Sequence, residues 1–301
     1  MRSIAILVLL STRAFADEMA TELDREDAPA GRNELGFDGG APLRGWGASL
    51  GLGYVARPLV VQNGEGQELA PIHRRITMVI GGAVAIGERV VVDGRFPMAR
   101  QIGRGLAPVG GRALDPWVAG DLRIAARVRF TGDEARDGSL FARAFLTLPT
   151  GNEMAFAGEA AATYGLAIIG RFRAENGVVL AASAGIKLRR EETMIGDALI
   201  GNELGGALGV VIPVPGNMRA SAEFLGAVGD ASDSSTGPAP LEGRVGFGVV
   251  AYKGFEFGAR IGAGFDDEIG APKWRAMLEV VWNGDARIPL PRIGEPDDGG
   301  E

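Results

Sequence analysis

The chain has 301 residues, a formal net charge of −7, no cysteine and a single histidine, His73. Without cysteine it forms no disulfides and no thiolate metal sites, and one histidine argues against most zinc sites and most histidine-dependent catalysis. The charge is uneven: residues 17–43 carry eight acids against two arginines, whereas residues 44–282 are neutral. This balance excludes a basic nucleic-acid surface. We therefore expect no cofactor, no metal site and no nucleic-acid partner.

Residues 1–16 predict a cleaved secretory signal peptide. Arg2 supplies a positive start, an apolar run follows over residues 4–10, and Ala14-Phe15-Ala16 matches an A-x-A cleavage site. The run is too short to anchor the chain in a membrane, and no later stretch is long enough for a transmembrane helix. Residues 17–43 and 283–301 are acidic, so we expect flexible segments at both ends of one body over residues 44–282.

A regular alternation of apolar and charged or small residues runs through residues 44–282. In GDLRIAARVRF, at residues 120–130, the arginines fall on odd positions and the large apolar residues on even ones. Successive side chains of a strand point to opposite faces, so this segment has one apolar and one charged face. Eleven other segments alternate in the same way, which makes twelve candidate strands. In chain order they are GWGASLGLGYVA, PIHRRITMVI, RVVVDGRFPM, GDLRIAARVRF, SLFARAFLTL, ATYGLAIIGRF, VVLAASAGIKL, ELGGALGVVI, MRASAEFLGAV, LEGRVGFGVVAY, FEFGARIGAGF and KWRAMLEVVW.

The connections between these segments alternate in length. Short turns are expected at 86–88, 131–138, 175–177, 215–217 and 253–254, and longer polar loops at 61–71, 100–118, 149–159, 189–202, 229–240 and 266–272. This pattern is typical of an all-β, up-and-down antiparallel transmembrane barrel, here of about 12 strands, with both ends on the periplasmic side. The alternative is a secreted soluble β-sandwich whose apolar face is a core, which would stay in solution without detergent.

Aromatic residues recur at a spacing that suits a membrane. Trp46 and Tyr54 share a face of the first candidate strand, and Trp274 and Trp282 share a face of the last. Eight residues rise about 27 Å along a strand. At a tilt of roughly 40° this becomes about 20 Å along the membrane normal, close to the apolar band that aromatic girdles flank. We therefore expect these four residues to form an aromatic girdle.

The face opposite the apolar one carries the charges, and in a barrel that face lines the lumen. Twelve bases and six acids, including Asp93, fall on it, so they cannot all pair. We expect a net positive interior that either forms a hydrogen-bonded ladder or lines a pore with weak anion preference. The other predicted lumen-lining residues are Arg75, Arg95, Asp121, Arg123, Arg127, Arg129, Arg143, Arg171, Lys187, Arg219, Glu223, Glu242, Arg244, Glu256, Arg260, Arg275 and Glu279.

Two motifs and one residue pair are candidates for catalysis. GASLG at 47–51 and GLGYVA at 51–56 match a nucleophile elbow and a dinucleotide motif, but neither has the strand–turn–helix context that its chemistry needs. The strand register places Ser49 about eight residues, or roughly 27 Å, from His73. We predict no catalytic residues, and a barrel enzyme acting on lipids stands as an alternative that these residues do not support. Another alternative, a transporter of apolar molecules, needs an apolar interior pocket or plug, and neither is expected here.

Four stretches together resemble a known family. AGDLRIAARVRF, FLTLPTGNE, IGNELGGALG and GFDDEIGAPKWRAMLEVVW are similar to the N-terminal barrel of OmpA-family proteins, in which GDLR, LPTG and GAPxxR segments recur. The resemblance implies an integral outer-membrane barrel that contacts outer-membrane lipid and lipopolysaccharide. It also implies assembly by the barrel-assembly machinery, since the last strand, ending at Trp282, resembles its C-terminal signal. No residues match the family's peptidoglycan-binding domain, so cell-wall anchoring is not carried over. The expected function is a porin-like passive channel for small polar or anionic solutes, or a plugged structural barrel.

Overall fold

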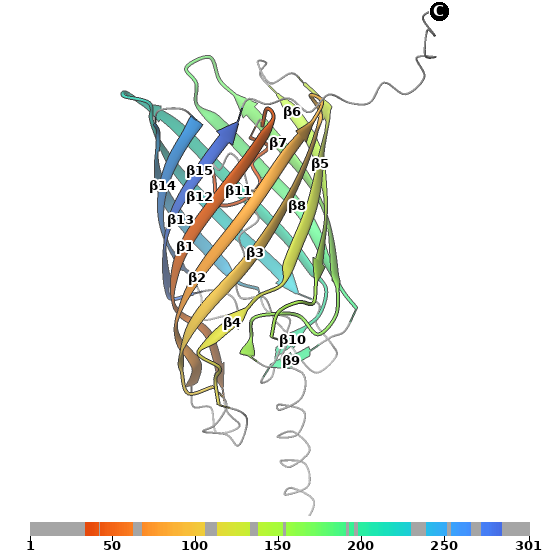
Figure 1. Ribbon diagram of the computed structural model, residues 1–301, viewed down its shortest axis with the longest axis vertical. Helices are drawn as coiled ribbons and strands as arrows, with labels where there is room; N and C mark the ends of the chain where they lie inside the picture. Colours follow the sequence, from red (N-terminus) through yellow and green to blue (C-terminus); the bar gives the residue numbers. More distant parts are fainter. Residues whose placement is uncertain are drawn as a thin grey trace, which may run out of the picture.

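Twelve long strands form one closed antiparallel barrel in the computed structural model (Figure 1). The structure describes residues 34–41, 43–62, 68–105, 113–132, 138–152, 155–190, 193–195, 198–229, 239–251, 254–265 and 272–284. The expected signal peptide, residues 17–33 and the tail from residue 285 lie outside the described residues.

The strands follow one another around the barrel in chain order. The long strands are β1 (Trp46–Gln62), β2 (Glu68–Ile86), β3 (Val90–Gly103), β5 (Leu122–Thr131), β6 (Ser139–Leu148), β7 (Thr163–Arg173), β8 (Val179–Arg189), β11 (Glu203–Val214), β12 (Met218–Gly229), β13 (Leu241–Val250), β14 (Phe255–Gly264) and β15 (Trp274–Gly284). The barrel closes because β1 pairs with both β2 and β15, so that Trp46 lies opposite Val84 and Gly284. The expectation of an up-and-down barrel of about 12 strands is confirmed.

Three short strands lie outside this pattern. β4 (Trp117–Ala119) pairs with β3, and β9 (Thr193–Ile195) pairs with β10 (Ala198–Ile200) as a separate hairpin. β1 and β2 continue past their expected ends into the expected loop at 61–71, with register shifts between Ala56 and Val61. Arg57, at the first shift, has a φ of 49°. The expected loop at 61–71 was therefore too long, because β1 extends to Gln62 and β2 begins at Glu68.

The alternation in sequence becomes an inside and an outside. On β5, Ile124 and Phe130 are 42% and 60% exposed, whereas Arg127 is 3% exposed. Other strands repeat this arrangement, with Leu208 and Leu278 both 60% exposed on the outer face. A soluble protein rarely exposes so continuous an apolar surface, and a lipid bilayer accommodates it. The soluble-sandwich alternative is therefore wrong, because the apolar residues cover the outside of a closed sheet.

The four predicted girdle residues meet in pairs across the seam between β1 and β15. The rings of Trp46 and Trp282 are 4.5 Å apart in an edge-to-face contact, and those of Tyr54 and Trp274 are stacked at 4.8 Å. Each pair lies at a different end of the paired segment, in which Ala48 lies opposite Trp282 and Ala56 opposite Trp274. The aromatic contacts therefore lie at both ends of the junction that closes the barrel. Separately, the described ranges contain no helix long and apolar enough to cross a membrane.

Candidate functional site: the barrel interior

One wall of the lumen is dominated by arginine. The inner faces of β3, β5, β6 and β7 carry six arginines, besides Arg173 at the exposed end of β7, against Asp93 on β3 and Asp121 directly before β5. The strand register brings the arginines together: Arg95 lies opposite Arg123, and Arg127 lies opposite Arg143. Like charges directly opposite one another destabilise a sheet unless anions compensate them. We call this set the arginine wall: Arg95, Arg123, Arg127, Arg129, Arg143 and Arg171.

Charges on the opposite wall are balanced. The inner faces of β12 to β15 carry four arginines and four glutamates, which pair within β13, between the neighbours β14 and β15, and between strands two apart in the sheet. Such a network of opposite charges holds the strands together. This wall therefore forms a ladder of paired charges, which is one of the two arrangements expected from the sequence, and we call these eight residues of β12 to β15 the ladder. Its nitrogen–oxygen distances are 2.8 Å for Arg219–Glu256, 2.8 Å for Arg244–Glu242, 3.4 Å for Arg260–Glu223, 3.3 Å for Arg260–Glu279 and 2.7 Å for Arg275–Glu242.

The chain that precedes β1 lies inside the barrel (Figure 1, red trace). We call residues 34–41 and 43–45 the luminal segment. Leu35, Phe37 and Asp38 are 1%, 3% and 3% exposed. Residues 34–43 were expected to belong to a flexible acidic segment, and that expectation was wrong for the part that the structure describes. The physical reason is charge: the segment carries acids, and the arginine wall has a surplus of bases.

Carboxylates of the luminal segment pair with the arginine wall. Asp38 lies 2.5 Å from Arg127 and 3.2 Å from Arg143, and Glu34 lies 2.5 Å from Arg171. Burial raises the pKa of the Asp38 carboxyl, but the charges of Arg127 and Arg143 outweigh burial, so the net pKa is lowered. Asp38 is therefore held as a carboxylate inside the barrel.

Apolar contacts fix the rest of the luminal segment. Leu35 and Phe37 pack in a buried cluster against the inner faces of β8, β11 and β12. Gly209 on β11 leaves room for them, because a Cβ there would lie 2.9 Å from both side chains. On the segment itself, Gly40 has a φ of 70° and lies so close to Phe141 that a Cβ would be 2.6 Å from its ring. The wall and the segment are therefore complementary in shape as well as in charge.

This packing corrects one argument made from the sequence. The transport of apolar molecules was disfavoured because neither an apolar interior pocket nor a plug was expected. The luminal segment supplies a plug with two large apolar side chains, and β8, β11 and β12 supply an apolar patch that receives them. That patch consists of Val179, Ala181, Ala207, Val211 and Leu225.

A loop between β6 and β7 also packs inside the barrel. We call residues 149–152 and 155–162 the inner loop. Asp121 accepts hydrogen bonds from the amides of Gly151 and Glu159, both at 2.7 Å. Arg75 donates to the carbonyl of Phe156 at 2.8 Å. Phe156 is 2% exposed and has a φ of 55°, a strained conformation for a bulky residue. The inner loop is thus held in place from several strands.

Glu159 attaches the inner loop to the β8 side of the lumen. Its carboxylate lies 2.8 Å from Lys187 and 3.2 Å from Arg189. Burial raises the pKa of Glu159, but the charges of Lys187 and Arg189 outweigh it, so the net pKa is lowered. Arg189 also pairs with Glu203 at 3.1 Å. The sequence predicted a long polar loop at residues 189–202 and did not predict this network of charges.

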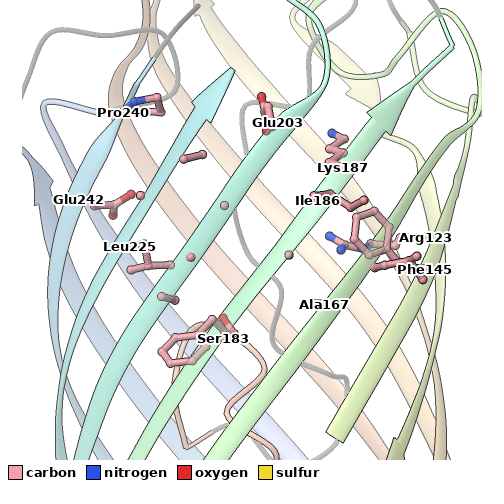
Figure 2. Close-up of a pocket in the computed structure, with 18 of the residues that line it drawn as sticks. Arg123, Phe145, Ala167, Ser183, Ile186, Lys187, Glu203, Leu225, Pro240 and Glu242 are labelled. Carbon is pink, nitrogen blue, oxygen red and sulfur yellow. The ribbon is translucent and has the colours of Figure 1, made fainter. Parts of the chain in front are cut away.

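An interior cavity of about 160 Å³ lies between the luminal segment and the end of the barrel that carries the long loops (Figure 2). Lys187 and Glu203 lie at one end of this cavity and Ser183 at the other, while Arg123 and Glu242 come from opposite sides. Phe37 of the luminal segment is also part of its lining. A cavity lined by both signs of charge and by aromatic groups suits a small polar solute.

A second cavity, of about 40 Å³, adjoins the luminal segment at Gly40 and Leu43, near the short turns. Its lining is strongly basic, with one acid, Glu88, among the described lining residues. The luminal segment contributes to the walls of both cavities and so narrows the lumen between them. The basic residues of this cavity are Arg89, Arg127, Arg129, Arg171 and Arg173.

Besides Asp93, which is buried on β3, the seventeen other predicted lumen-lining residues all lie on the inner faces of their strands or, for Asp121, directly before a strand. Arg129, Arg171, Lys187, Arg219 and Glu279 are half-buried. The arginine wall and the ladder bring most of them into two groups. The buried ones are Arg75, Arg95, Asp121, Arg123, Arg127, Arg143, Glu223, Glu242, Arg244, Glu256, Arg260 and Arg275.

Sequence reasoning missed Glu34, Asp38, Glu159 and Arg189. One pattern pointed to the first two: the predicted interior had twice as many bases as acids, and the acidic residues 17–43 directly precede the barrel. Charge balance inside a low-dielectric lumen favours a segment that brings acids in.

The catalytic pair considered from the sequence is far apart. Ser49 lies opposite Gly81 on β2, eight positions along that strand from His73, and His73 is exposed. In the part of the chain that the structure describes, no group of three or more His, Cys, Asp or Glu side chains is placed to hold a metal ion.

Comparison with known proteins shows which solved structures share this fold. No protein-family model and no curated protein sequence matches the chain. Among solved structures, the COG4313 outer membrane channel from Pseudomonas putida F1 is similar, with 15% identity, a TM-score of 0.60, and coverage of 87% of this chain and 99% of that one. The NanC porin is similar at 4% identity and a TM-score of 0.52, over 78% of this chain and 99% of that one. At such identities the likeness concerns the fold, which is that of outer-membrane channel barrels.

Proposed function

We propose that this chain is an outer-membrane porin-like passive channel for small polar or anionic solutes, with a lumen narrowed by the luminal segment. The observation that carries the proposal is the arginine wall, which gives one side of the lumen six arginines against two aspartates, while the opposite ladder is balanced. A confined, low-dielectric passage with such a surplus concentrates anions.

The acids of the luminal segment reduce that surplus without removing it. Asp38 and Glu34 are the segment's two described acids and pair with Arg127, Arg143 and Arg171. In addition to these pairs, Arg89, Arg129 and Arg173 line the second cavity, near the short turns. The passage is therefore both narrow and positive, which favours small anions over cations.

The environment of the channel is part of the same proposal. The exposed apolar outer face suits outer-membrane lipid, and the long loops suit contact with lipopolysaccharide. The last strand, which ends near Trp282, is suited to recognition by the barrel-assembly machinery. The GDLR, LPTG and GAPxxR segments support kinship with OmpA-family barrels. We propose no enzymatic activity, since Ser49 and His73 are far apart and the similar solved structures are a channel and a porin.

The proposal is tested by electrical recording from the purified protein in a planar bilayer under a potassium chloride gradient. We expect discrete conductance steps and a reversal potential of the sign set by chloride. The Glu175→Gln variant is the control, because Glu175 is an exposed residue of the β7–β8 turn and does not line the described cavities. A reversal potential set by potassium would refute anion preference. Silence in every recording would favour a plugged structural barrel.

A second candidate, transport of apolar molecules, is favoured by one observation. The patch on β8, β11 and β12 that holds Leu35 and Phe37 is apolar and lies inside the barrel. An apolar solute that displaced these side chains would find a matching surface. Binding of an apolar aromatic fluorescent probe, such as a naphthylamine dye, to the purified protein tests this candidate. Binding that rises when Leu35 and Phe37 are both changed to serine would support it over a purely polar passage.

A further inference from the structure

We infer that Arg127, Arg143 and Arg171 form a binding site for carboxylate-bearing solutes, which two carboxylates of the chain itself, Asp38 and Glu34, occupy in this structure. The inference rests on the proposed channel function and names the class of solute that the arginine wall recognises. The luminal segment then acts as an internal competitor that a solute displaces.

Arg127 and Arg143 together provide a fork for one carboxylate. They lie directly opposite each other on β5 and β6, and each guanidinium contacts a different oxygen of Asp38, at 2.5 Å and 3.2 Å. All three side chains are buried, with 3–4% exposure. Charge-assisted bonds of this kind are the strongest that a protein offers to a carboxylate. Because like charges face each other here, the pair requires an anion between its two members.

Neighbouring groups hold this fork in position. Asp93 lies 3.3 Å from Arg143, and the ring of Phe141 lies 5.1 Å from the guanidinium carbon of Arg127. These contacts come from the barrel wall and do not depend on the luminal segment. The fork therefore keeps part of its orientation when Asp38 leaves it, which lowers the entropic cost of binding a solute.

Arg171 extends the site to a second carboxylate. It pairs with Glu34 at 2.5 Å and donates to the carbonyl of Gly39 at 3.2 Å. Arg171 and Arg127 both line the basic cavity near the short turns. Two anchoring points for carboxylates, next to a basic cavity, favour a solute with two carboxylates over one with a single charge.

Docking of the segment and binding of such a solute exclude each other, because both use the same guanidinium groups. A solute must compete with Asp38, so removing the charge of Asp38 should strengthen solute binding. Asp38→Asn keeps the size of the side chain and removes only the charge. This change separates competition from a change in packing.

The test measures binding of succinate to the purified full barrel in detergent by isothermal titration calorimetry, with succinamide as the uncharged probe. We expect Asp38→Asn to bind succinate at least tenfold more tightly than the unchanged protein, and neither to bind succinamide. Asp38→Asn combined with Arg127→Gln should lose the gain, and Arg171→Gln serves in place of Arg127→Gln if the latter does not fold. Glu175→Gln, on the β7–β8 turn, should bind succinate as the unchanged protein does.

Three results would overturn the inference: equal succinate affinity with and without Asp38→Asn, equal binding of succinamide, or inorganic phosphate binding tenfold more tightly than succinate. Bilayer recordings with the same variants separate this inference from the channel proposal. Succinate binding that responds to Asp38→Asn in a barrel that never conducts would retain the site and refute the channel. Clear chloride currents with no such response would retain the channel and refute the site.

Discussion

Replacing Gly209 with valine should release the luminal segment without touching any charge. Gly209 lies on the inner face of β11, and a Cβ there would be 2.9 Å from the side chains of Leu35 and Phe37. Valine suits a strand, so the barrel wall accepts it. Its branched side chain takes the space that the two residues of the segment occupy.

The size of the effect follows from the buried surface. Leu35 and Phe37 are 1% and 3% exposed, and burying such a side chain is worth about 1.5–3 kcal/mol. We expect Gly209→Val to remove about 2–4 kcal/mol of docking free energy, between one and two such contributions. Since about 1.4 kcal/mol corresponds to a tenfold change, the undocked fraction should rise roughly 30- to 700-fold.

A single introduced thiol reports this fraction, because the chain has no cysteine of its own. Ala41→Cys places the thiol on the luminal segment, where Ala41 is 5% exposed. In detergent, the rate of reaction with a bulky maleimide should rise in the Gly209→Val background. The matched control is Gly205→Val on the same face of β11, where a Cβ would lie at ordinary contact distances of 3.6 Å and 3.8 Å. Heat-modifiable gel mobility verifies that each barrel is folded. Equal labelling rates in the two valine variants would refute the reasoning.

Other expected outcomes concern pH, the inner loop and the outer face. Because the pKa of Asp38 is lowered, its carboxylate stabilises docking of the luminal segment at pH values above the pKa of the unfolded chain, about 3.9, and this stabilisation is lost as pH falls through the lowered pKa. Wild-type conductance should therefore be constant from about pH 7 to 5 and rise only below about pH 4. Asp38→Asn should abolish that rise. Glu159→Gln should cost about 1–2 kcal/mol. It should speed exchange of the Gly151 amide hydrogen roughly 5- to 30-fold, and unchanged exchange would mean that Lys187 and Arg189 do not hold the inner loop. Leu208→Arg, on the outer face, should cost about 2–4 kcal/mol in urea unfolding from vesicles, and a cost no larger than that of Leu208→Ala would argue against lipid contact there.

The barrel was predictable because each strand has to sort its side chains between lipid and lumen. Alternation on β5 assigns Arg123 and Arg127 to the inside and Ile124 to the outside without knowledge of any partner strand. Loop lengths then gave the strand order. The ends of β1 and β2 were not predictable in the same way, because the register of this strand pair shifts between Ala56 and Val61, and a shift in register interrupts the regular alternation of faces.

The luminal segment could not be predicted from its own residues. Leu35, Phe37 and Asp38 follow no strand or helix period, and their environment is created by inner-face residues distant in the chain, such as Gly209 and Arg143. Only the surplus of bases over acids in the predicted lumen pointed to a missing anion. An imbalance of charge indicates that a partner of opposite charge is needed, and the fold determines which residue supplies it.

The most direct test of the account is the reversal potential of the wild-type barrel in a planar bilayer under a potassium chloride gradient, recorded beside Gly209→Val. The account predicts anion-selective steps in the wild-type protein and larger steps of the same selectivity when the luminal segment is released. Cation selectivity, or silence in both proteins, would contradict it.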